Sequence, residues 1–600
     1  MDPRAALKSV FGFDDFRPGQ ESVVRALLQR QNVLAIMPTG AGKSLCFQLP
    51  AVLAAGLTVV VSPLIALMEN QVALMTAMGV PAATINSGRQ REANVAVWRR
   101  VQAGEVKLLY MSPERLLDER MIAALQRLPI EHFVIDEVHC VSQWGHDFRP
   151  EYLQLARLRE MFPGVPIAGF TATADQATRR DILAKIFAGE AQQFGLGFDR
   201  PNIQLAVEDR RQPNKRLIEL MAEHKGEQGI VYCLARRTVD RIAELLNENG
   251  FPALPYHAGL DAEVRRRHLD RFLTDPSVTV VATIAFGMGI DKPDIRFVFH
   301  LDLPSNMEAY YQEIGRAGRD GKPARAVLLY GFDGIRIRRA MIDESNASDE
   351  QKRIEHRRLD ALLSYCEASS CRRQALLAYF GEQHGPCGNC DQCLSPSETV
   401  DGTEQVRALL ETIEATGQIY GQMHVIDVLM GRSNDKLHRA GHDRLATYGL
   451  GKGRDEGYWR SVLRQLYAAN VIMIDFAQYG AARLTERGWR VLRQGERVML
   501  RADSGSRQAS VGRKTKHVPM PESVDGALLA QLKRLRAELA RARAVPAYVV
   551  FSDKSLIDMA TRRPRDRRQF AEVYGVGERK LAEFADLFLA EIARHLGAEA

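Results

Sequence analysis

Residues 37–44, Met-Pro-Thr-Gly-Ala-Gly-Lys-Ser, have the composition of a P-loop, a turn that binds a nucleoside triphosphate such as ATP. An apolar run precedes them and a helical pattern begins near Ser44. In this arrangement backbone N–H groups and the helix dipole face the phosphates, the lysine reaches the β/γ-phosphates and the serine ligates Mg²⁺. Met37 departs from the strict pattern, so a glycine turn without a ligand is the alternative. The candidate nucleotide ligands are Thr39, Gly40, Gly42, Lys43 and Ser44.

Two acidic residues, Asp136 and Glu137, directly follow the apolar run 133–135. A carboxylate at the end of a buried strand can hold Mg²⁺ through water, and its neighbour can orient and deprotonate the water that attacks a γ-phosphate. Two acids at a loop entrance are also common without any such role. The P-loop upstream favours the catalytic interpretation, with Asp136 as the metal ligand and Glu137 as the base.

A glutamine, Gln20, stands at the start of an amphipathic helix, one strand before the P-loop. Its amide could pair with the N6/N7 edge of an adenine, because donor and acceptor match. An ordinary surface glutamine is the alternative. Its place in the chain favours adenine recognition.

Two arginines, Arg316 and Arg319, lie three residues apart in the stretch 312–321. This spacing predicts that both lie on one helical face and present planar guanidinium groups, the chemistry of an arginine finger that stabilises charge on a transferring phosphoryl group. Arginine pairs on protein surfaces usually serve solvation alone.

Four of the eight cysteines crowd one short segment: Cys371, Cys387, Cys390 and Cys393. Four thiolates within reach of one another can bind tetrahedral Zn²⁺. The overlapping spacing also fits an iron–sulfur cluster. A disulfide pair is the less favoured alternative, because the other four cysteines are scattered and the chain reads as a reduced, intracellular protein.

An aromatic and polar segment, residues 139–150, follows the two acids. Trp144 and Phe148 offer flat faces on which unpaired bases can stack, and Arg149 can meet a phosphate. The alternative is that Trp144 fills the core. The polar residues around it make the segment unsuited to a core position, and we expect it to contact unpaired bases.

The whole chain of 600 residues exceeds what one hydrophobic core serves, so we expect roughly three to five domains. Its net charge of +7 suits a polyanionic partner without proving one. No apolar run approaches about 18 residues, and no secretory signal begins the chain, so we expect a cytosolic protein without membrane contact.

The candidate site residues lie in a chain where short apolar runs alternate with helical patterns. The runs 57–61, 106–111, 133–135 and 167–170 predict a parallel sheet covered on both faces. A ligand site is expected at the carboxyl ends of its strands. The runs 230–233, 278–282 and 296–300 predict a second set of strands.

In their order along the chain, these motifs resemble those of superfamily 2 helicases, and the segment 139–150 resembles the aromatic-rich loop of RecQ DNA helicases. The chain has Asp-Glu-Val-His where the family usually has Asp-Glu-Ala-His. The resemblance implies two tandem RecA-like parallel-sheet lobes, followed by a small helical zinc module, a winged helix and a small all-α HRDC domain. It also implies that Arg17 and Gln20 contact the nucleotide, that Gln312 is one of the catalytic residues, and that Arg316 and Arg319 face the P-loop. We favour Arg319 as the finger and Arg316 as its partner.

We expect six segments: a first lobe over 1–205, a second over 206–340, a zinc module over 341–397, a winged helix over 398–500, a flexible basic linker over 501–523 and an HRDC domain over 524–600. By the resemblance, the four cysteines hold structural Zn²⁺. The candidate DNA contacts are His139, Trp144, Phe148, Arg149 and Tyr548. Tyr479, at the tip of an expected hairpin, is a candidate strand wedge or a plain turn residue.

The resemblance implies an ATP- and Mg²⁺-dependent DNA helicase that moves 3′ to 5′ on single-stranded DNA, unwinds double-stranded DNA and serves repair, recombination and replication. It further implies a monomer at the nucleoid with single-strand DNA-binding protein and a topoisomerase as partners. One alternative is an RNA helicase of the same superfamily, which the aromatic loop, cysteine cluster and winged helix disfavour. Another is a DNA-binding regulator without activity, which intact Lys43, Asp136, Glu137 and Arg319 disfavour.

Overall fold

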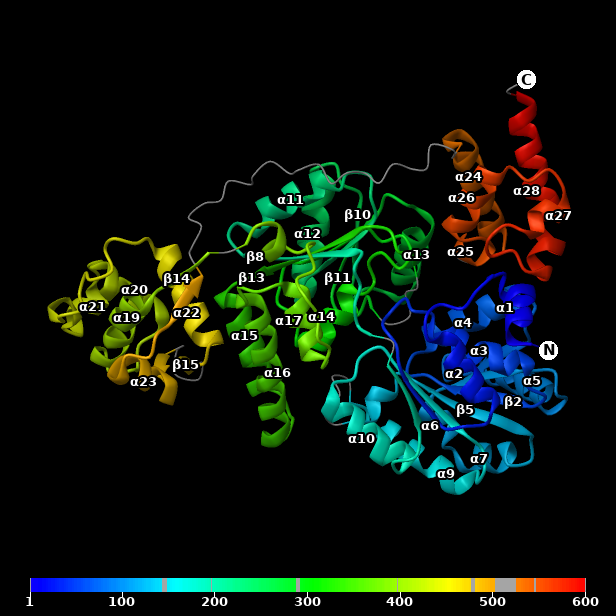
Figure 1. Cartoon of the computed structure of the whole chain (residues 1–600), viewed down its shortest axis with the longest axis horizontal. Helices are drawn as coiled ribbons and strands as arrows, with labels where there is room; N and C mark the ends of the chain where they lie inside the picture. The colour runs from blue at the N-terminus through cyan, green and yellow to red at the C-terminus, as the bar shows by residue number, and fades with distance from the viewer. Residues whose placement is uncertain are drawn as a thin grey trace.

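The computed structural model describes residues 2–142, 148–195, 197–287, 292–396, 398–475, 481–501, 525–543 and 547–598. Two parallel sheets form the centre of the molecule (Figure 1). The first-lobe sheet has seven parallel strands in the order β3-β4-β2-β5-β6-β1-β7. The apolar run before the P-loop and the four predicted runs after it supply five of them, whereas β3 and β7 were not predicted. Their bounds are β1 Val33–Ile36, β2 Leu57–Val61, β3 Ala82–Ile85, β4 Leu108–Met111, β5 Ile130–Asp136, β6 Ile167–Thr171 and β7 Gln192–Gly195.

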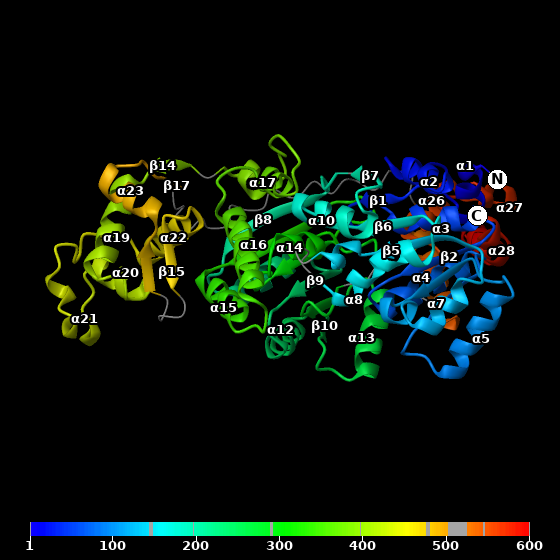
Figure 2. The same ribbon diagram turned by 90° about the horizontal axis from the view of Figure 1, so that it is seen from below.

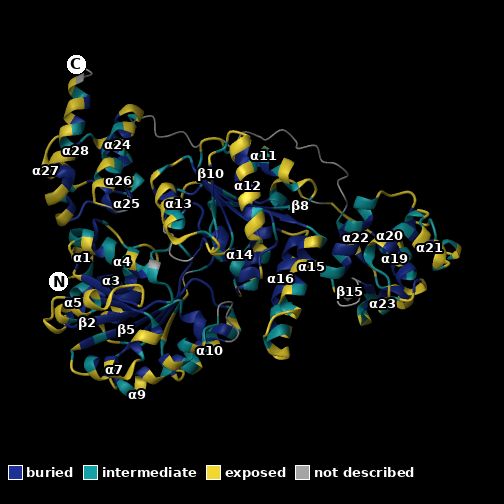
Figure 3. Ribbon diagram, turned by 180° about the vertical axis from the view of Figure 1, so that it is seen from behind, coloured by how far each residue is buried: buried dark blue, intermediate teal, exposed yellow. Residues whose placement is uncertain are grey.

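Helices cover both faces of this sheet, which explains why β1, β2, β4 and β6 are buried along their whole length (Figure 3). They are α1 Pro3–Phe11, α2 Gln20–Leu28, α3 Lys43–Leu53, α4 Ile65–Ala77, α5 Arg91–Gln102, α6 Pro113–Leu116, α7 Glu119–Leu125, α8 Pro150–Leu153, α9 Leu158–Met161 and α10 Gln176–Phe187, with 3-10 turns η1 Val138–Val141 and η2 Gln154–Arg157. The core divides into two buried clusters, one on each side of the strands.

The second lobe is a six-stranded parallel sheet in the order β10-β11-β9-β12-β13-β8. Its strands are β8 Ile203–Asp209, β9 Gly229–Tyr232, β10 Ala253–Tyr256, β11 Thr279–Ala282, β12 Phe297–His300 and β13 Ala324–Tyr330. Its helices are α11 Pro213–Glu223, α12 Arg236–Glu248, α13 Ala262–Thr274, α14 Met307–Ile314 and α15 Phe332–Asp343. The chain crosses from one lobe to the other between β7 and β8, so the described linker residues 197–202 lie beside both.

The cysteine-rich module is helical, as predicted, with α16 Asp349–Glu367, α17 Arg372–Tyr379 and α18 Asp391–Leu394. It packs against the second lobe: residue Leu205 of β8 forms a bridge with Cys390, and Asp391 accepts the N–H of Val207 at 3.2 Å.

The next domain combines helices with a two-stranded hairpin and lies at one end of the molecule, beyond the second lobe (Figures 1 and 2). Its elements are α19 Thr403–Ala415, α20 Gln422–Met430, α21 Asp435–Arg439, η3 His442–Arg444, α22 Glu456–Ala468, β15 Ile472–Asp475, β16 Ala481–Leu484 and α23 Glu486–Gln494, with β14 Thr399–Asp401 paired to β17 Met499–Arg501. The hairpin expected around Tyr479 is confirmed by the antiparallel β15–β16 pair. Tyr479 is outside the described residues.

The C-terminal helices lie against the first lobe, near α1 and α4 (Figures 1 and 2). They are α24 Gly526–Ala542, α25 Ala547–Val550, α26 Asp553–Arg562, α27 Arg567–Ala571 and α28 Glu578–Ala598. The N–H of Gly575 donates to the carbonyl of Gly12 at 2.7 Å, and the rings of Phe13 and Tyr574 are 5.5 Å apart. Among the described residues, none of the helices combines the length and apolar character that crossing a membrane requires.

Candidate nucleotide cleft and metal centre

The P-loop, residues 37–44, connects β1 to α3 at the carboxyl edge of the first sheet. Gly40 and Gly42 have φ angles of 85° and 81°, a left-handed backbone that glycine adopts without strain. Gly42 caps α3, so Lys43 begins a helix whose first N–H groups are available to an anion. A Cβ at Gly42 would lie 2.5 Å from Nε2 of Gln20. The backbone and its neighbours thus fit a phosphate cradle.

The amide of Gln20 is bonded to the P-loop itself. Its Nε2 donates to the carbonyls of Ala41 at 2.9 Å and Gly42 at 3.3 Å, and its Oε1 accepts the N–H of Arg17 at 2.8 Å. The Arg17 guanidinium donates to the carbonyl of Gly40. These contacts hold the loop in shape. The adenine contact predicted for Gln20 would require its amide to exchange one of these bonds, and it stays a prediction.

Asp136 and Glu137 lie at the carboxyl end of β5, beside the P-loop. Nζ of Lys43 is 3.9 Å from Oε1 of Glu137. Glu137 has a φ of 50°, a left-handed backbone that costs a non-glycine residue of order 1–3 kcal/mol and that is concentrated at functional sites. Burial and the adjacent Glu137 raise the pKa of Asp136, while Lys43 acts against that shift. A divalent cation at Asp136 would likewise favour the ionised carboxylate.

A chain of polar contacts runs from Glu137 across the cleft to the second lobe. Nδ1 of His139 is 3.3 Å from Oε2 of Glu137 and 2.8 Å from Oγ1 of Thr171. Oγ1 of Thr171 in turn donates to the carbonyl of Thr173, whose own Oγ1 accepts from Nε2 of Gln312 at 3.2 Å. Gln312, on α14, therefore contacts the first lobe, and its catalytic role stays a prediction.

His139 was predicted to contact DNA, but its side chain is only 1% exposed. Its place between Glu137 and Thr171 favours a link inside the cleft over direct contact with a strand. Thr171 and Thr173 were not singled out as site residues. The sequence could have indicated them, because both threonines follow the apolar run 167–170. That run becomes β6, which lies between the strand that precedes the P-loop and the strand that carries the acids.

The prediction that Arg316 and Arg319 share a helical face is wrong. Helix α14 ends at Ile314, and both arginines lie on the turn that follows, where Gly315 caps the helix. The two side chains consequently point to different partners. Arg316 is buried and donates to the carbonyl of Gly287 in its own lobe.

Arg319 lies over the P-loop of the opposite lobe. A Cβ added at Gly40 would be 3.1 Å from Cγ of Arg319. Arg319 therefore lies beside the phosphate cradle, and its role as the finger stays a prediction.

The thiols of the four clustered cysteines lie close together. Their Sγ atoms all lie within 4.8 Å of one another, with 3.9 Å between Cys371 and Cys390 and 3.9 Å between Cys387 and Cys393. Thiolates about 2.3 Å from one tetrahedral ion are about 3.8 Å apart, so the set fits a single Zn²⁺. These separations exceed the roughly 2.05 Å of a disulfide, which excludes that alternative. An iron–sulfur cluster places several metal atoms between its thiolates and fits this spacing less well.

The aromatic segment is described only in part. Phe148 and Arg149 are half-buried, and Arg149 donates to the carbonyl of Pro63 at 3.3 Å. On the other side of the segment, Oγ of Ser142 donates to Asp181 at 2.6 Å. Trp144 and the side chain of Tyr548 lie outside the described part of the structure, so their predicted stacking on bases stays a prediction.

Five family models match the chain in succession. They are the DEAD/DEAH box helicase model over residues 17–182, the helicase conserved C-terminal domain over 212–321, the RecQ zinc-binding model over 333–394, the RQC domain over 396–509 and the HRDC domain over 525–592. The first two cover the lobes that form the cleft, and the third contains the four cysteines.

Among curated proteins, the chain is similar over nearly its full length to bacterial proteins named ATP-dependent DNA helicase RecQ. The protein of Haemophilus influenzae is 40% identical over 596 residues, which are 98% of this chain and 96% of the relative. Those of Pasteurella multocida and Bacillus subtilis are 41% and 36% identical over 592 residues, covering 98% of this chain and 93% and 98% of the relatives. This chain, with its two-lobed cleft and its Cys₄ zinc-binding module, belongs to the RecQ family of ATP-dependent DNA helicases.

Proposed function

We propose that the protein uses ATP hydrolysis to move 3′ to 5′ along single-stranded DNA and to unwind the duplex ahead of it. One observation carries the proposal: Lys43 and Glu137 of one lobe and Arg319 of the other meet at the same P-loop. A site divided between two lobes can couple the state of the nucleotide to the distance between the lobes. Its closing and opening would then drive steps along a strand.

Within the cleft, the P-loop N–H groups and Lys43 would hold the β- and γ-phosphates. Ser44 and Asp136 would hold Mg²⁺, which neutralises charge on those phosphates when bound. Glu137 would orient and deprotonate the attacking water, with His139 fixing its carboxylate. Arg319 would stabilise the charge that develops on the transferred phosphoryl group.

The four cysteines would hold one structural Zn²⁺, with the sulfur geometry as the supporting observation. A Cys₄ ion contributes to the folding of a small module whose apolar core is limited.

DNA would be held by several surfaces. Trp144, Phe148 and Arg149 would meet the single strand beside Glu137, the winged helix would meet the duplex, and Tyr548 would add a stacking contact. The expected domain boundaries, the monomeric state, a place in the cytoplasm at the nucleoid, roles in repair and recombination, and contacts with single-strand DNA-binding protein and a topoisomerase belong to this proposal as well. They follow from the family resemblance.

The test is ATP-dependent unwinding of two duplexes that differ only in carrying a 3′ or a 5′ single-stranded tail. We expect the 3′-tailed duplex to be unwound and the 5′-tailed one to remain paired. The Glu137→Gln variant should bind both substrates and unwind neither. A preference for the 5′ tail would overturn the polarity, and unwinding by Glu137→Gln would overturn the assigned base.

A further inference from the structure

An arginine of the linker, Arg200, joins the two halves of the cleft. Its Nη1 donates to the carbonyl of Thr39 in the P-loop at 2.7 Å and to that of Gly315 at 3.1 Å. Its Nη2 donates to the carbonyls of Ala317 at 2.8 Å and Gly318 at 3.0 Å. All four terminal N–H groups of one guanidinium therefore bind backbone, one in the first lobe and three in the second.

The three carbonyls in the second lobe belong to the turn that carries Arg316 and Arg319. This turn ends helix α14, where carbonyls lose their helical partners and the helix dipole is negative. A planar, fork-shaped cation suits such a set of acceptors better than a lysine, whose single ammonium group has three donors at one point. Arg200 thereby fixes the backbone on both sides of Arg316 and immediately before Arg319.

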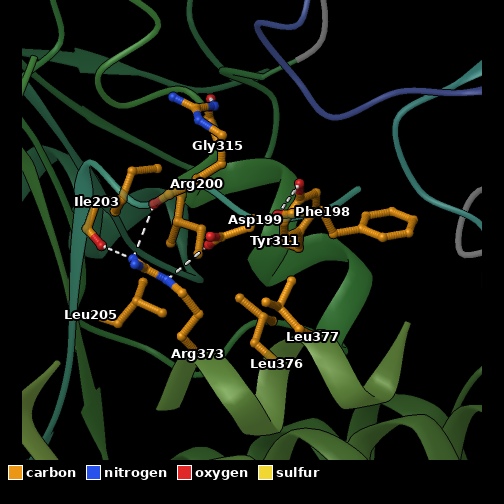
Figure 4. A pocket seen from close by; sticks show the side chains of 11 residues that line it. Phe198, Asp199, Arg200, Ile203, Leu205, Tyr311, Gly315, Arg373, Leu376 and Leu377 are labelled. Carbon is orange, nitrogen blue, oxygen red and sulfur yellow. Dashed lines mark hydrogen bonds and ion pairs between the residues drawn. The ribbon is translucent and has the colours of Figure 1, made fainter. Parts of the chain in front are cut away.

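The backbone of Arg200 is itself fixed from the cysteine-rich module (Figure 4). Arg373, on α17, donates to the carbonyls of Arg200 at 3.0 Å and of Ile203, and it pairs with Asp199 at 3.1 Å. In the same pocket the hydroxyl of Tyr311 donates to the carbonyl of Phe198 at 2.9 Å. Arg373 and Tyr311 therefore hold the backbone of the linker, while the Arg200 side chain points away from Arg373 toward the cleft.

The surroundings of Arg200 also change its pKa. Burial lowers its pKa to about 10; Arg319 and Arg17 add to that shift, whereas Tyr311 and Asp320 act against it, and Arg200 stays protonated at neutral pH. Several cations thus surround the P-loop, and the four hydrogen bonds that Arg200 makes to described residues all go to neutral carbonyls. A bound triphosphate would offset this repulsion and favour the closed arrangement.

We propose that Arg200 is a positioning residue that fastens the turn 315–320 to the P-loop and so holds Arg319 over the phosphates. The proposal rests on the proposed ATP hydrolysis at this cleft. Three of its bonds would travel with the second lobe when the cleft opens, and only the bond to Thr39 would break. Arg200 would then act on hydrolysis through Arg319, without touching the nucleotide.

The test is a double-variant cycle on the full-length protein, measured as kcat and KM for DNA-stimulated ATP hydrolysis. Arg200→Gln should lower kcat roughly 10- to 100-fold, because a misplacement of about 1 Å can cost about 10²-fold. KM for ATP should change less than about threefold, since Lys43 and the P-loop remain. Combined with Arg319→Ala, it should add less than about threefold to the loss from Arg319→Ala alone.

The matched control is Arg210→Gln, which removes a guanidinium whose bonds to described residues lie within the second lobe, to the carbonyl of Leu301 at 2.7 Å and to Asp302 at 3.0 Å. It should leave kcat close to that of the wild type. Should Arg200→Gln fail to fold, as judged by thermal unfolding, Arg200→Lys enters the same cycle with the same expectation, because it keeps the charge and loses the fork.

The role of Arg200 would be overturned if the losses in kcat of Arg200→Gln and Arg319→Ala multiplied in the double variant. It would also be overturned if Arg200→Gln kept the kcat of the wild type. A wild-type protein that hydrolyses no ATP in the presence of DNA would instead contradict the proposed function itself. The two failures are therefore distinguishable.

Discussion

The two lobes are built on the same kind of parallel sheet, yet they place their cleft residues in different ways. In the first lobe, Lys43 follows the loop after β1 and Glu137 follows β5, two strands of one sheet that are separated only by β6, so the sheet itself brings them together. In the second lobe, Arg319 lies on a turn beyond a helix, and the backbone of that turn is bonded by Arg200 of the linker. The first lobe thus places its residues by its sheet, whereas the second places Arg319 by a turn and the contacts made to it.

The largest effect that sharpens this comparison is expected from Glu137→Gln. Loss of a general base lowers kcat for ATP hydrolysis by roughly 10²- to 10⁴-fold. Affinity for ATP should change little, because Lys43 and the P-loop N–H groups remain. Glu131→Gln is the matched control. Glu131 lies on β5, at the end of the strand opposite to Glu137, and forms an ion pair with Arg30. Equal losses in the two variants would mean that Glu137 serves only stability.

A smaller effect is expected from Arg316→Ala. Arg316 bonds the carbonyl of Gly287 within its own lobe, so its removal should disturb the second lobe without removing the group over the P-loop. A hydrogen bond to a charged group contributes about 1.5–3 kcal/mol, which corresponds to roughly a 10- to 100-fold loss in kcat. Steady-state ATPase rates measure this. If Arg316→Ala were more damaging than Arg319→Ala, the assignment of the finger would be reversed.

Removal of the metal extends the comparison to the cysteine-rich module. Cys390→Ser should lose the bound metal, lower the temperature of unfolding, and lower kcat several-fold, because Arg373 of that module holds the backbone of Arg200. Metal analysis and thermal unfolding of the same preparation give the first two quantities. Cys366→Ser is the control, since Cys366 is a buried cysteine outside the cluster. A variant that retains one zinc per chain would contradict the assigned ligands.

The smallest effect is expected from Gln20→Ala. Its amide bonds the carbonyls of Ala41 and Gly42, so its loss should loosen the P-loop and raise KM for ATP a few-fold, with little change in kcat. Comparing KM for ATP and for GTP separates the two interpretations of this residue. If Gln20 only supports the loop, both values rise together, whereas an adenine contact would raise the KM for ATP alone.

The cleft residues of the first lobe could be predicted from the sequence more completely than those of the second. The P-loop, the two acids and the cysteine cluster could be predicted because each is a short run or a fixed spacing. The arginine turn was misjudged as a helical face, although Gly315 and Gly318 could have indicated that the helix stops. Arg200 was missed because its acceptors lie 161 and 115 residues away in Thr39 and Gly315 and are backbone atoms, which leave no side-chain signature.

The most direct test of the account is single-turnover ATP hydrolysis by Arg319→Ala, with ATP affinity measured on the same preparation. We predict that ATP binds within about threefold of wild type, while hydrolysis slows by roughly 10³-fold or more, as for other arginine fingers. Arg325→Ala, which removes a partly exposed ion pair with Glu223 elsewhere in the second lobe, should hydrolyse ATP at the wild-type rate. Hydrolysis by Arg319→Ala within about tenfold of wild type would contradict the claim that the second lobe completes the site.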